Sequence, residues 1–183
     1  MALDLLSVCR WLALPPNELL DACRQTRYQG SGPGGQKRNR VYSGVRLIHP
    51  ESGISIEADA HRESRRNLED ALHRLRLELA LSVVSASRLR NAEGGADVAA
   101  GAEASMAFRA TAFRANASPA HDDFALFALR AVYFLNQHQG RASAAAQALG
   151  CTASALTRFL KTDKTLWVKA KEIREAHGLH PLK

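Results

Sequence analysis

At 183 residues and 46% hydrophobic content, the chain is long enough for one ordinary core or two small ones, which excludes wholesale disorder. Its 25 Lys and Arg against 18 Asp and Glu give a formal net charge of +7, which favours a polyanionic partner such as nucleic acid. The opening residues MALDLLSVCRWLAL contain an acid and lack a basic start, so they are not typical of a signal peptide, and no stretch is apolar for long enough to span a membrane. We therefore expect a cytoplasmic protein without a membrane partner.

The positive charge has two foci along the chain. Residues 24–46 contain six cations and no acid, and residues 124–183 contain nine cations and three acids, so each stretch carries +6. The three cysteines are odd in number and far apart, which argues against a disulfide framework. Because the seven histidines include no pair at the i, i+4 spacing of zinc ligands, we expect no metal site, and nothing else in the sequence indicates a cofactor.

Residues 1–23 are expected to form two N-terminal packing helices. Apolar residues recur at helical spacing from Leu5 to Leu12 and stop before a double proline, and a second short helix is indicated over 17–23. Both helices would serve to pack against the rest of the chain.

Residues 24–90 are predicted to form a small β-sheet covered by a long helix. The stretch VYSGVRLIH (41–49) alternates, PESG (50–53) supplies turn residues, and ISIEA (54–58) alternates again, which together predict a β-hairpin. A helix is predicted from about 62 to 84, and the apolar stripe that would cover one face of the sheet consists of Leu68, Leu72, Leu75 and Leu79. This part of the chain therefore belongs to the α+β class.

The rest of the chain is predicted to be an Ala- and Gly-rich linker, residues 91–117, followed by an all-helical domain, residues 118–183. Ser118 and Pro119 are typical of a helix start, with Asp122 and Asp123 in the first turn, and the apolar positions continue to a stop at HQG.

Residues 143–163 of that domain have a helix-turn-helix pattern. Ala146, Gly150 and Leu156 fall where the motif requires a small residue, the turn glycine and a core aliphatic residue. One interpretation is a nucleic-acid-facing helix that presents Thr152, Ser154, Thr157, Arg158 and Lys161. The other is a compact bundle with a core of Leu149, Leu156, Phe159, Leu160 and Trp167, and the sequence leaves both open.

The stretch GSGPGGQKRNR, residues 30–40, places four glycines in six residues beside three cations. It matches G-x-G-x-x-G literally, but a dinucleotide fingerprint requires a following helix, and here a strand pattern follows. A P-loop is also disfavoured, because Gln36 stands where that motif requires lysine. Since glycine is entropically costly in ordered structure, by about 0.5–1 kcal/mol each, this density indicates a backbone that presents its own N–H groups or passes a narrow gap.

The run SGPGGQKRNRVYSGVRLIHPESGI resembles the catalytic domain of class I peptide chain release factors and of related ribosome-rescue peptidyl-tRNA hydrolases, whose pattern is S-G-x-G-G-Q followed by x-V-N and S-A-V-R. The resemblance covers roughly residues 24–85, where Arg62, Ser64 and Asn67 echo an R-S-Q-x-x-N stretch of the family. Arg38 and Gly44 depart from the usual valine and alanine, but the G-G-Q triplet, which gives the GGQ domain its name, is intact.

The resemblance implies hydrolysis of the ester that joins a peptide to the tRNA 3′ end, in the peptidyl-transferase centre of the large ribosomal subunit. Gly34 and Gly35 would form a slender tip with backbone angles closed to other residues. The backbone N–H of Gln36 would donate to the developing negative charge, and its side-chain amide would help to place water. These three residues are the predicted catalytic residues, in a monomer that acts on the ribosome and peptidyl-tRNA.

The cations near the triplet are predicted to neutralise phosphates of ribosomal RNA, which holds register without reading sequence. The predicted RNA-binding residues are Lys37, Arg38, Arg40, Arg46, Arg27, Arg62 and Arg65. The alternative for these residues is a basic loop and helix start that simply face water.

Only 23 residues precede the predicted GGQ domain, too few for a codon-reading domain, and the long basic tail of the known rescue hydrolases is missing, so we expect no stop-codon specificity. The leading hypothesis is a codon-independent peptidyl-tRNA hydrolase in the rescue of stalled ribosomes. The alternatives are a helix-turn-helix nucleic-acid-binding regulator and a ribosome-associated RNA-binding factor without catalysis.

Overall fold

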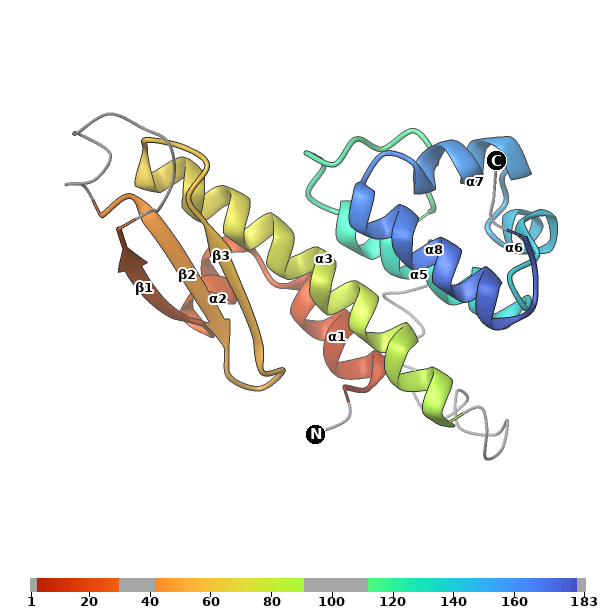
Figure 1. Ribbon diagram of the computed structural model, residues 1–183, viewed down its shortest axis with the longest axis horizontal. Coiled ribbons are helices and arrows are strands. Elements are labelled where there is room, and N and C mark those ends of the chain that lie inside the picture. The colour runs from red at the N-terminus through yellow and green to blue at the C-terminus, as the bar shows by residue number, and fades with distance from the viewer. Residues whose placement is uncertain (1–2, 30–41, 91–111, 181–183) are drawn as a thin grey trace. The chain divides into compact units, whose positions relative to one another are not determined.

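A computed structural model of the protein describes residues 3–29, 42–90 and 112–180. The chain divides into two compact units, one of residues 14–79 and the other of residues 2–13 together with 80–183. Figure 1 shows the helices and strands of each unit.

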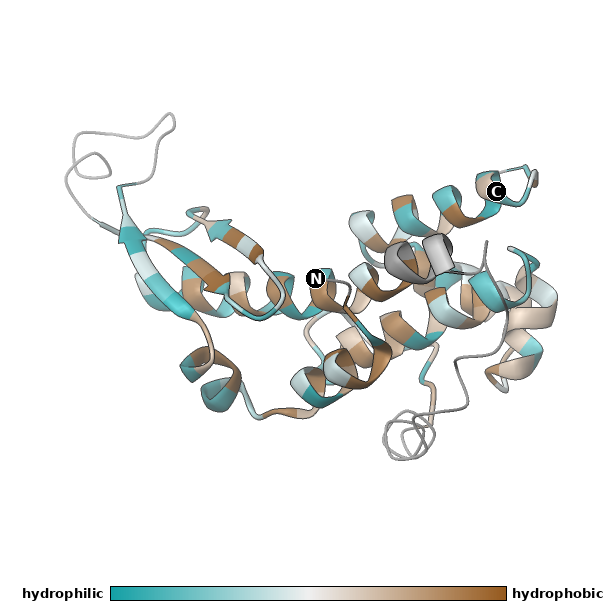
Figure 2. Cartoon of the chain, turned by 90° about the horizontal axis from the view of Figure 1, so that it is seen from below, coloured by the Kyte–Doolittle hydropathy of each residue, from teal (hydrophilic) through white to brown (hydrophobic). Residues whose placement is uncertain are grey.

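The first unit contains a three-stranded antiparallel sheet in the order β1-β2-β3. The strands are β1 (Arg24–Tyr28), β2 (Gly44–His49) and β3 (Ile54–Ala58), preceded by the short helix α2 (Pro16–Asp21). The predicted hairpin is confirmed, with β2 and β3 joined through the turn at PESG. The strand β1 was not predicted, because four of its five residues are exposed and it therefore lacks the alternation of a half-buried strand (Figure 2).

One face of this sheet is apolar and is covered by the first part of the long helix α3 (Ser64–Arg90), as Figure 1 shows. Val45 and Leu47 of β2 are fully buried, as are Leu75 and Leu79 of α3. Arg74 of α3 donates from Nη1 to the backbone oxygen of Glu57 in β3, at 2.7 Å. The α+β class predicted from the sequence is thereby confirmed for this part of the chain.

The second unit is helical. It contains α1 (Leu5–Ala13), α5 (Phe124–Gln137), α6 (Ala142–Ala148), α7 (Ala153–Leu160) and α8 (Lys164–Ala176). The most apolar of these helices, α5, buries nine of its fourteen residues and contacts α6, α7 and α8. Phe113, which the sequence analysis placed in the linker, packs edge-on against Phe127 and Phe159, with ring centroids 6.2 and 5.1 Å apart.

The predicted start of α5 is wrong: the helix begins at Phe124 and not at Ser118 and Pro119. The backbone N–H of His121 donates to the oxygen of Ser118, and that of Asp123 donates to Nδ1 of His121. The N–H groups of His121 and Asp123 are therefore bonded within turns and not to the carbonyl oxygens four residues earlier, as a longer helix would require. The predicted stop at HQG is confirmed, with α5 ending at Gln137.

No helix in the described part of the chain is long and apolar enough to cross a membrane. Within the same residues, no group of three or more His, Cys, Asp or Glu side chains could hold a metal ion. All three cysteines are free, and burial raises the pKa of the Cys9 thiol to about 11.

Candidate catalytic and RNA-binding site

The ends of the glycine-rich segment are held together by the sheet. Tyr28, the last residue of β1, pairs with Gly44, the first residue of β2, so residues 29–43 connect two neighbouring antiparallel strands. The predicted catalytic residues Gly34, Gly35 and Gln36 lie outside the described residues, as do Lys37, Arg38 and Arg40. Because strands lie on both sides of the segment, it cannot be the strand-to-helix turn of a dinucleotide-binding site.

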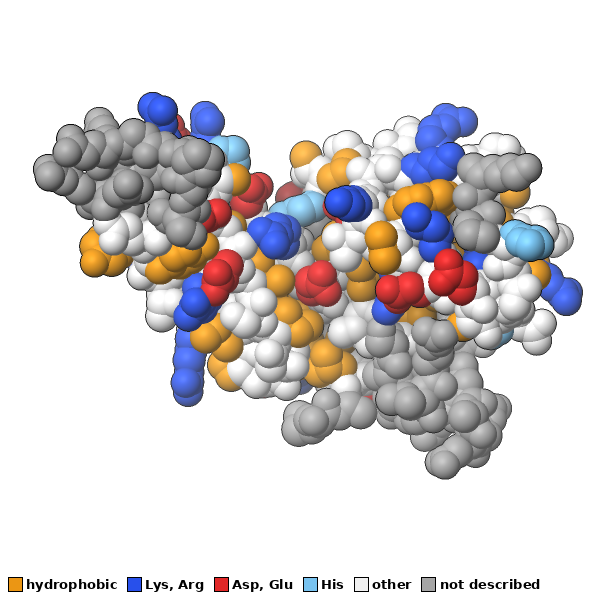
Figure 3. Space-filling model, in the orientation of Figure 1, with side chains coloured by type: hydrophobic (Ala, Val, Ile, Leu, Met, Phe, Trp, Pro, Cys, Tyr) orange, Lys and Arg blue, Asp and Glu red, His pale blue; other side chains and the backbone are white. Residues whose placement is uncertain are grey.

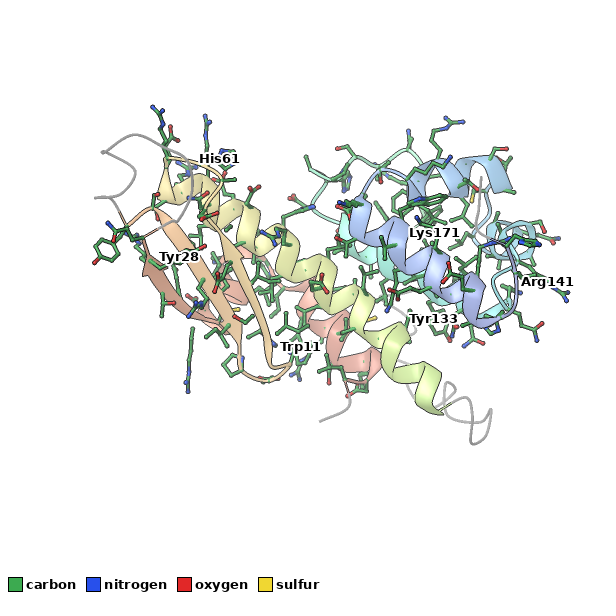
Figure 4. All side chains as sticks on the ribbon, in the orientation of Figure 1. Trp11, Tyr28, His61, Tyr133, Arg141 and Lys171 are labelled. Atoms are coloured by element: carbon green, nitrogen blue, oxygen red, sulfur yellow. The ribbon has the colours of Figure 1, made fainter. Side chains whose placement is uncertain are left out.

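Tyr28 and Gly44 are in close approach at this end of the sheet. A Cβ atom at residue 44 would lie 2.9 Å from Cζ of the Tyr28 ring, which is too close. Only glycine at this position leaves room for the ring without a shift of one of the two residues. The guanidinium of Arg46 lies 5.9 Å from the centroid of the same ring. Burial, with Asp59 and Glu57 adding to it, raises the pKa of Tyr28 above its ordinary value. Figure 4 labels Tyr28 at this end of the sheet.

The buried side chain of Asn67, near the start of α3, fixes the segment that leads into β2. Its Nδ2 donates to the backbone oxygens of Ser43 at 2.7 Å and His61 at 2.8 Å, and its Oδ1 accepts from the backbone N–H of His61 at 2.8 Å. Asn67 is fully buried, and these three bonds tie the start of α3 to the last residue before β2. Of the predicted stretch with Arg62, Ser64 and Asn67, it is Asn67 that holds Ser43, the residue from which the chain enters β2.

Of the predicted RNA-binding cations that the structure describes, some form ion pairs with acidic side chains and some do not. Arg46 bonds through Nε to Oε1 of Glu57 at 2.7 Å, and Arg65 forms an exposed pair with Glu69 at 3.1 Å. Arg27 on β1 and Arg62 before α3 are exposed and form no ion pair within the described residues. Of the four, Arg27 and Arg62 thus have the charges that are not already balanced by a neighbouring acid.

The helix-turn-helix pattern has its expected structural features in the second unit. Ala146 of α6 and Leu156 of α7 are buried, and Gly150 in the turn between them has a φ of +72°. The hydroxyl of Thr152 caps α7 by accepting from the N–H of Ala155 at 3.2 Å. Four of the five residues of the predicted bundle core are buried, while Trp167 is half-buried, and the exposed side of α7 carries Ser154 and Arg158.

Residues 19–117 match the family model described as the RF-1 domain. The chain belongs to this family. The match includes β1, the glycine-rich segment, β2, β3 and α3, so the sheet and helix described above are the RF-1 domain of this protein. Helices α5 to α8 lie beyond the matched residues.

Several named relatives share part of this domain. The chain is 41% identical over 56 residues to Peptide chain release factor 1 of Amoebophilus asiaticus (strain 5a2), which covers 31% of this chain and 16% of that protein. It is also 41% identical over 56 residues to Peptide chain release factor 2 of Caulobacter sp. (strain K31), covering 31% of this chain and 15% of the relative. The matched segments are thus about a sixth of the length of these relatives, and no solved structure matches the chain.

Tyr28 and Glu57 were not among the predicted site residues, and no structural role was predicted for Asn67. Tyr28 belongs to the unpredicted strand, and Glu57 faces Arg46 only through the register of β2 and β3. A tight turn at 50–53 sets Arg46 opposite Glu57, so the predicted hairpin implies this register. The ion pair could therefore have been predicted from the sequence.

Proposed function

We propose that the protein hydrolyses the ester bond of peptidyl-tRNA on the ribosome, in the cytoplasm, without requiring a stop codon. The observation that carries the proposal is the GGQ triplet, residues 34–36, on a segment joining two paired strands of an RF-1 domain. The names of the relatives, peptide chain release factors 1 and 2, favour the same chemistry.

In the proposed reaction, water attacks the ester carbonyl carbon, the bond to the 3′ oxygen of the tRNA breaks, and a proton passes to that oxygen. The products are the peptide with a free carboxyl group, which then loses its proton to solvent, and the tRNA with a free 3′ hydroxyl. The backbone N–H of Gln36 donates to the oxygen on which negative charge develops, a contribution on the order of 3 kcal/mol. The side-chain amide of Gln36 orients the water, and glycines at 34 and 35 keep the approach narrow.

The residues that flank the glycine-rich segment on either side in the sequence support this role. The Tyr28–Gly44 pair keeps the two ends of the segment one strand spacing apart, and Asn67 bonds to Ser43 where the segment re-enters the sheet. Arg27 and Arg62 supply charge for phosphates of large-subunit ribosomal RNA near these residues. The protein acts as a monomer in the rescue of stalled ribosomes.

The test is release of a labelled peptide from ribosomes that hold peptidyl-tRNA in the P site. Three complexes are compared, with a sense codon, a stop codon or no codon in the A site. We expect the wild type to release peptide from all three, and Gly35→Ala and Gln36→Ala to release it far more slowly while they still sediment with ribosomes. Gln25→Ala, an exposed glutamine on β1, is the matched control and should leave the rate unchanged.

Two results would count against the proposal. Absence of release by the wild type on every complex removes the hydrolase function. Release only in the presence of a stop codon leaves the hydrolysis in place and removes the codon independence.

A further inference from the structure

A basic surface lies on helices α7 and α8 of the second unit, outside the residues that match the RF-1 domain. We define this α7–α8 surface by Arg158, Lys161, Lys164 and Lys171, with Trp167 among them. Figure 3 shows Lys and Arg side chains gathered over α7 and the adjoining part of α8. Residues 142–161, which include all of α6 and α7, contain the cations Arg158 and Lys161 and no acid.

Two of these cations, Lys161 and Lys171, contact the ring of Trp167. The Nζ atom of Lys161 lies 5.2 Å from the centroid of the Trp167 ring, and that of Lys171 lies 5.7 Å from it. The electron-rich face of an indole attracts ammonium groups and offsets part of the repulsion between them. Both ammonium groups are therefore held at the same indole ring before any ligand arrives, and anionic oxygens of one ligand that reached both would relieve the remaining repulsion.

The four cations of the α7–α8 surface form no ion pair within the described residues, unlike other cations nearby. Lys169 pairs with Glu172 at 3.1 Å, and Arg174 bonds to the backbone oxygens of Gly140 and His180. The carboxylate of Asp163 accepts from the backbone N–H groups of Thr165 and Leu166 and so caps α8. Lys169 and Arg174 are thus engaged by groups of the protein itself, whereas the four cations of the α7–α8 surface are exposed or half-exposed.

The first turn of α7 argues against reading of base sequence. In a helix-turn-helix protein on DNA, the N-terminal residues of the second helix contact base edges, usually through long side chains that donate or accept in pairs. Here those positions are Ala153, Ser154 and Ala155, which are too short for such contacts, whereas Arg158 and Lys161 lie in the second half of the helix and beyond it. The surface is suited to phosphate contacts, which position a protein without specifying sequence.

We propose that the α7–α8 surface binds the phosphate backbone of RNA and anchors the protein there, separately from the glycine-rich segment. The choice of RNA over DNA rests on the proposed function. Lys161 and Lys171, which both lie at the Trp167 ring, contact one stretch of backbone, and Arg158 and Lys164 extend the contact along the helices.

The experiment measures fluorescence anisotropy of the full chain with a labelled RNA hairpin and with a DNA hairpin of the same sequence, over a series of salt concentrations. The test variant is Lys161→Gln with Lys171→Gln. The charge-matched control is Arg10→Gln with Arg141→Gln, which removes two exposed cations from the same unit. Figure 4 shows Arg141 well apart from Lys171. A third variant, Lys161→Arg with Lys171→Arg, keeps the charge.

We expect the Lys161→Gln, Lys171→Gln variant to bind the RNA hairpin about tenfold more weakly and to lower the slope of log affinity against log salt by about two, one for each phosphate that is no longer neutralised. The control variant should change affinity less than about twofold, and the arginine variant should bind like the wild type. Equal reductions of affinity in the test and control variants, or tighter binding of the DNA hairpin, would overturn the proposal. Peptide release does not enter this readout, so the outcome is independent of whether the hydrolase function holds.

Discussion

Asn67 connects three backbone groups, one on Ser43 and two on His61. It is fully buried, and its hydrogen bonds reach Ser43, 24 residues earlier, and both the N–H and the oxygen of His61. A buried polar group that loses its partner costs about 1–3 kcal/mol. We therefore expect Asn67→Ala to lower the free energy of unfolding by about 3 kcal/mol, measured by urea denaturation. Asn17→Ala, an exposed asparagine in α2, is the control, and a similar loss there would contradict the role given to Asn67.

His49 at the end of β2 is buried and neutral. The backbone N–H of Ser52 donates to its Nδ1 at 3.2 Å, and burial lowers the pKa of the imidazole below its ordinary value, with Glu51 opposing the shift. The unfolded chain then takes up this proton at a higher pH than the folded one. The contribution of neutral His49 to the free energy of unfolding is therefore complete above a pH of about 6.5 and is lost as the pH falls toward the lowered pKa.

A substitution isolates this contribution. His49→Gln keeps an acceptor for Ser52 and removes the titration, so the free energy of unfolding should depend less on pH between about 7 and about 5.5 than in the wild type. Urea denaturation over that range measures it. Parallel curves for the two proteins would mean that His49 does not contribute to acid sensitivity.

The cations near the glycine-rich segment were predicted without their ion pairs, although the hairpin register and the helical spacing imply both pairs. Arg46 lies in an ion pair with Glu57, and Arg65 pairs with Glu69 one helical turn away. The second pair follows from the i, i+4 spacing in the sequence. The hydrogen bonds of Asn67 could not be predicted, because they depend on how α3 packs against residues far away in the chain.

At the scale of elements, alternation and turn residues predicted β2, β3 and the turn between them, because one face of that hairpin is buried. The same reasoning missed β1, whose hydrogen bonds to β2 hold it in place although its side chains are largely exposed. The long helix α3 was predicted from its leucine stripe. The start of α5 was predicted too early, because proline and acidic residues also suit the turns that precede the helix.

The turn between α6 and α7 offers a direct test of the helix-turn-helix geometry. Gly150 has a φ of +72°, and no atom lies within 4 Å of the place where a Cβ would be, so only the backbone conformation opposes a side chain there. We expect Gly150→Ala to destabilise the protein by about 1 kcal/mol and Gly150→Asn by less, because asparagine tolerates this conformation better. Equal losses in urea denaturation for the two variants would contradict this explanation.

At the scale of the whole chain, the two foci of positive charge fall in different units. The cations of residues 24–46 belong to the RF-1 domain, and those of α7 and α8 belong to the helical unit that the family model does not match. The resemblance predicted the first unit in outline and its chemistry as a hypothesis. It could not predict a role for the second unit, whose basic surface depends on the packing of Lys161 and Lys171 against Trp167.

The central claim is that the backbone N–H of Gln36 stabilises the transition state of ester hydrolysis. Single-turnover peptide release at saturating protein, compared between Gln36→Ala and Gln36→Pro, tests it most directly, because alanine keeps the N–H and proline removes it. We predict that release by Gln36→Pro is slower than release by Gln36→Ala by roughly a hundredfold, in line with the loss of one oxyanion donor. Equal rates for the two variants, with both bound to the ribosome, would contradict the claim.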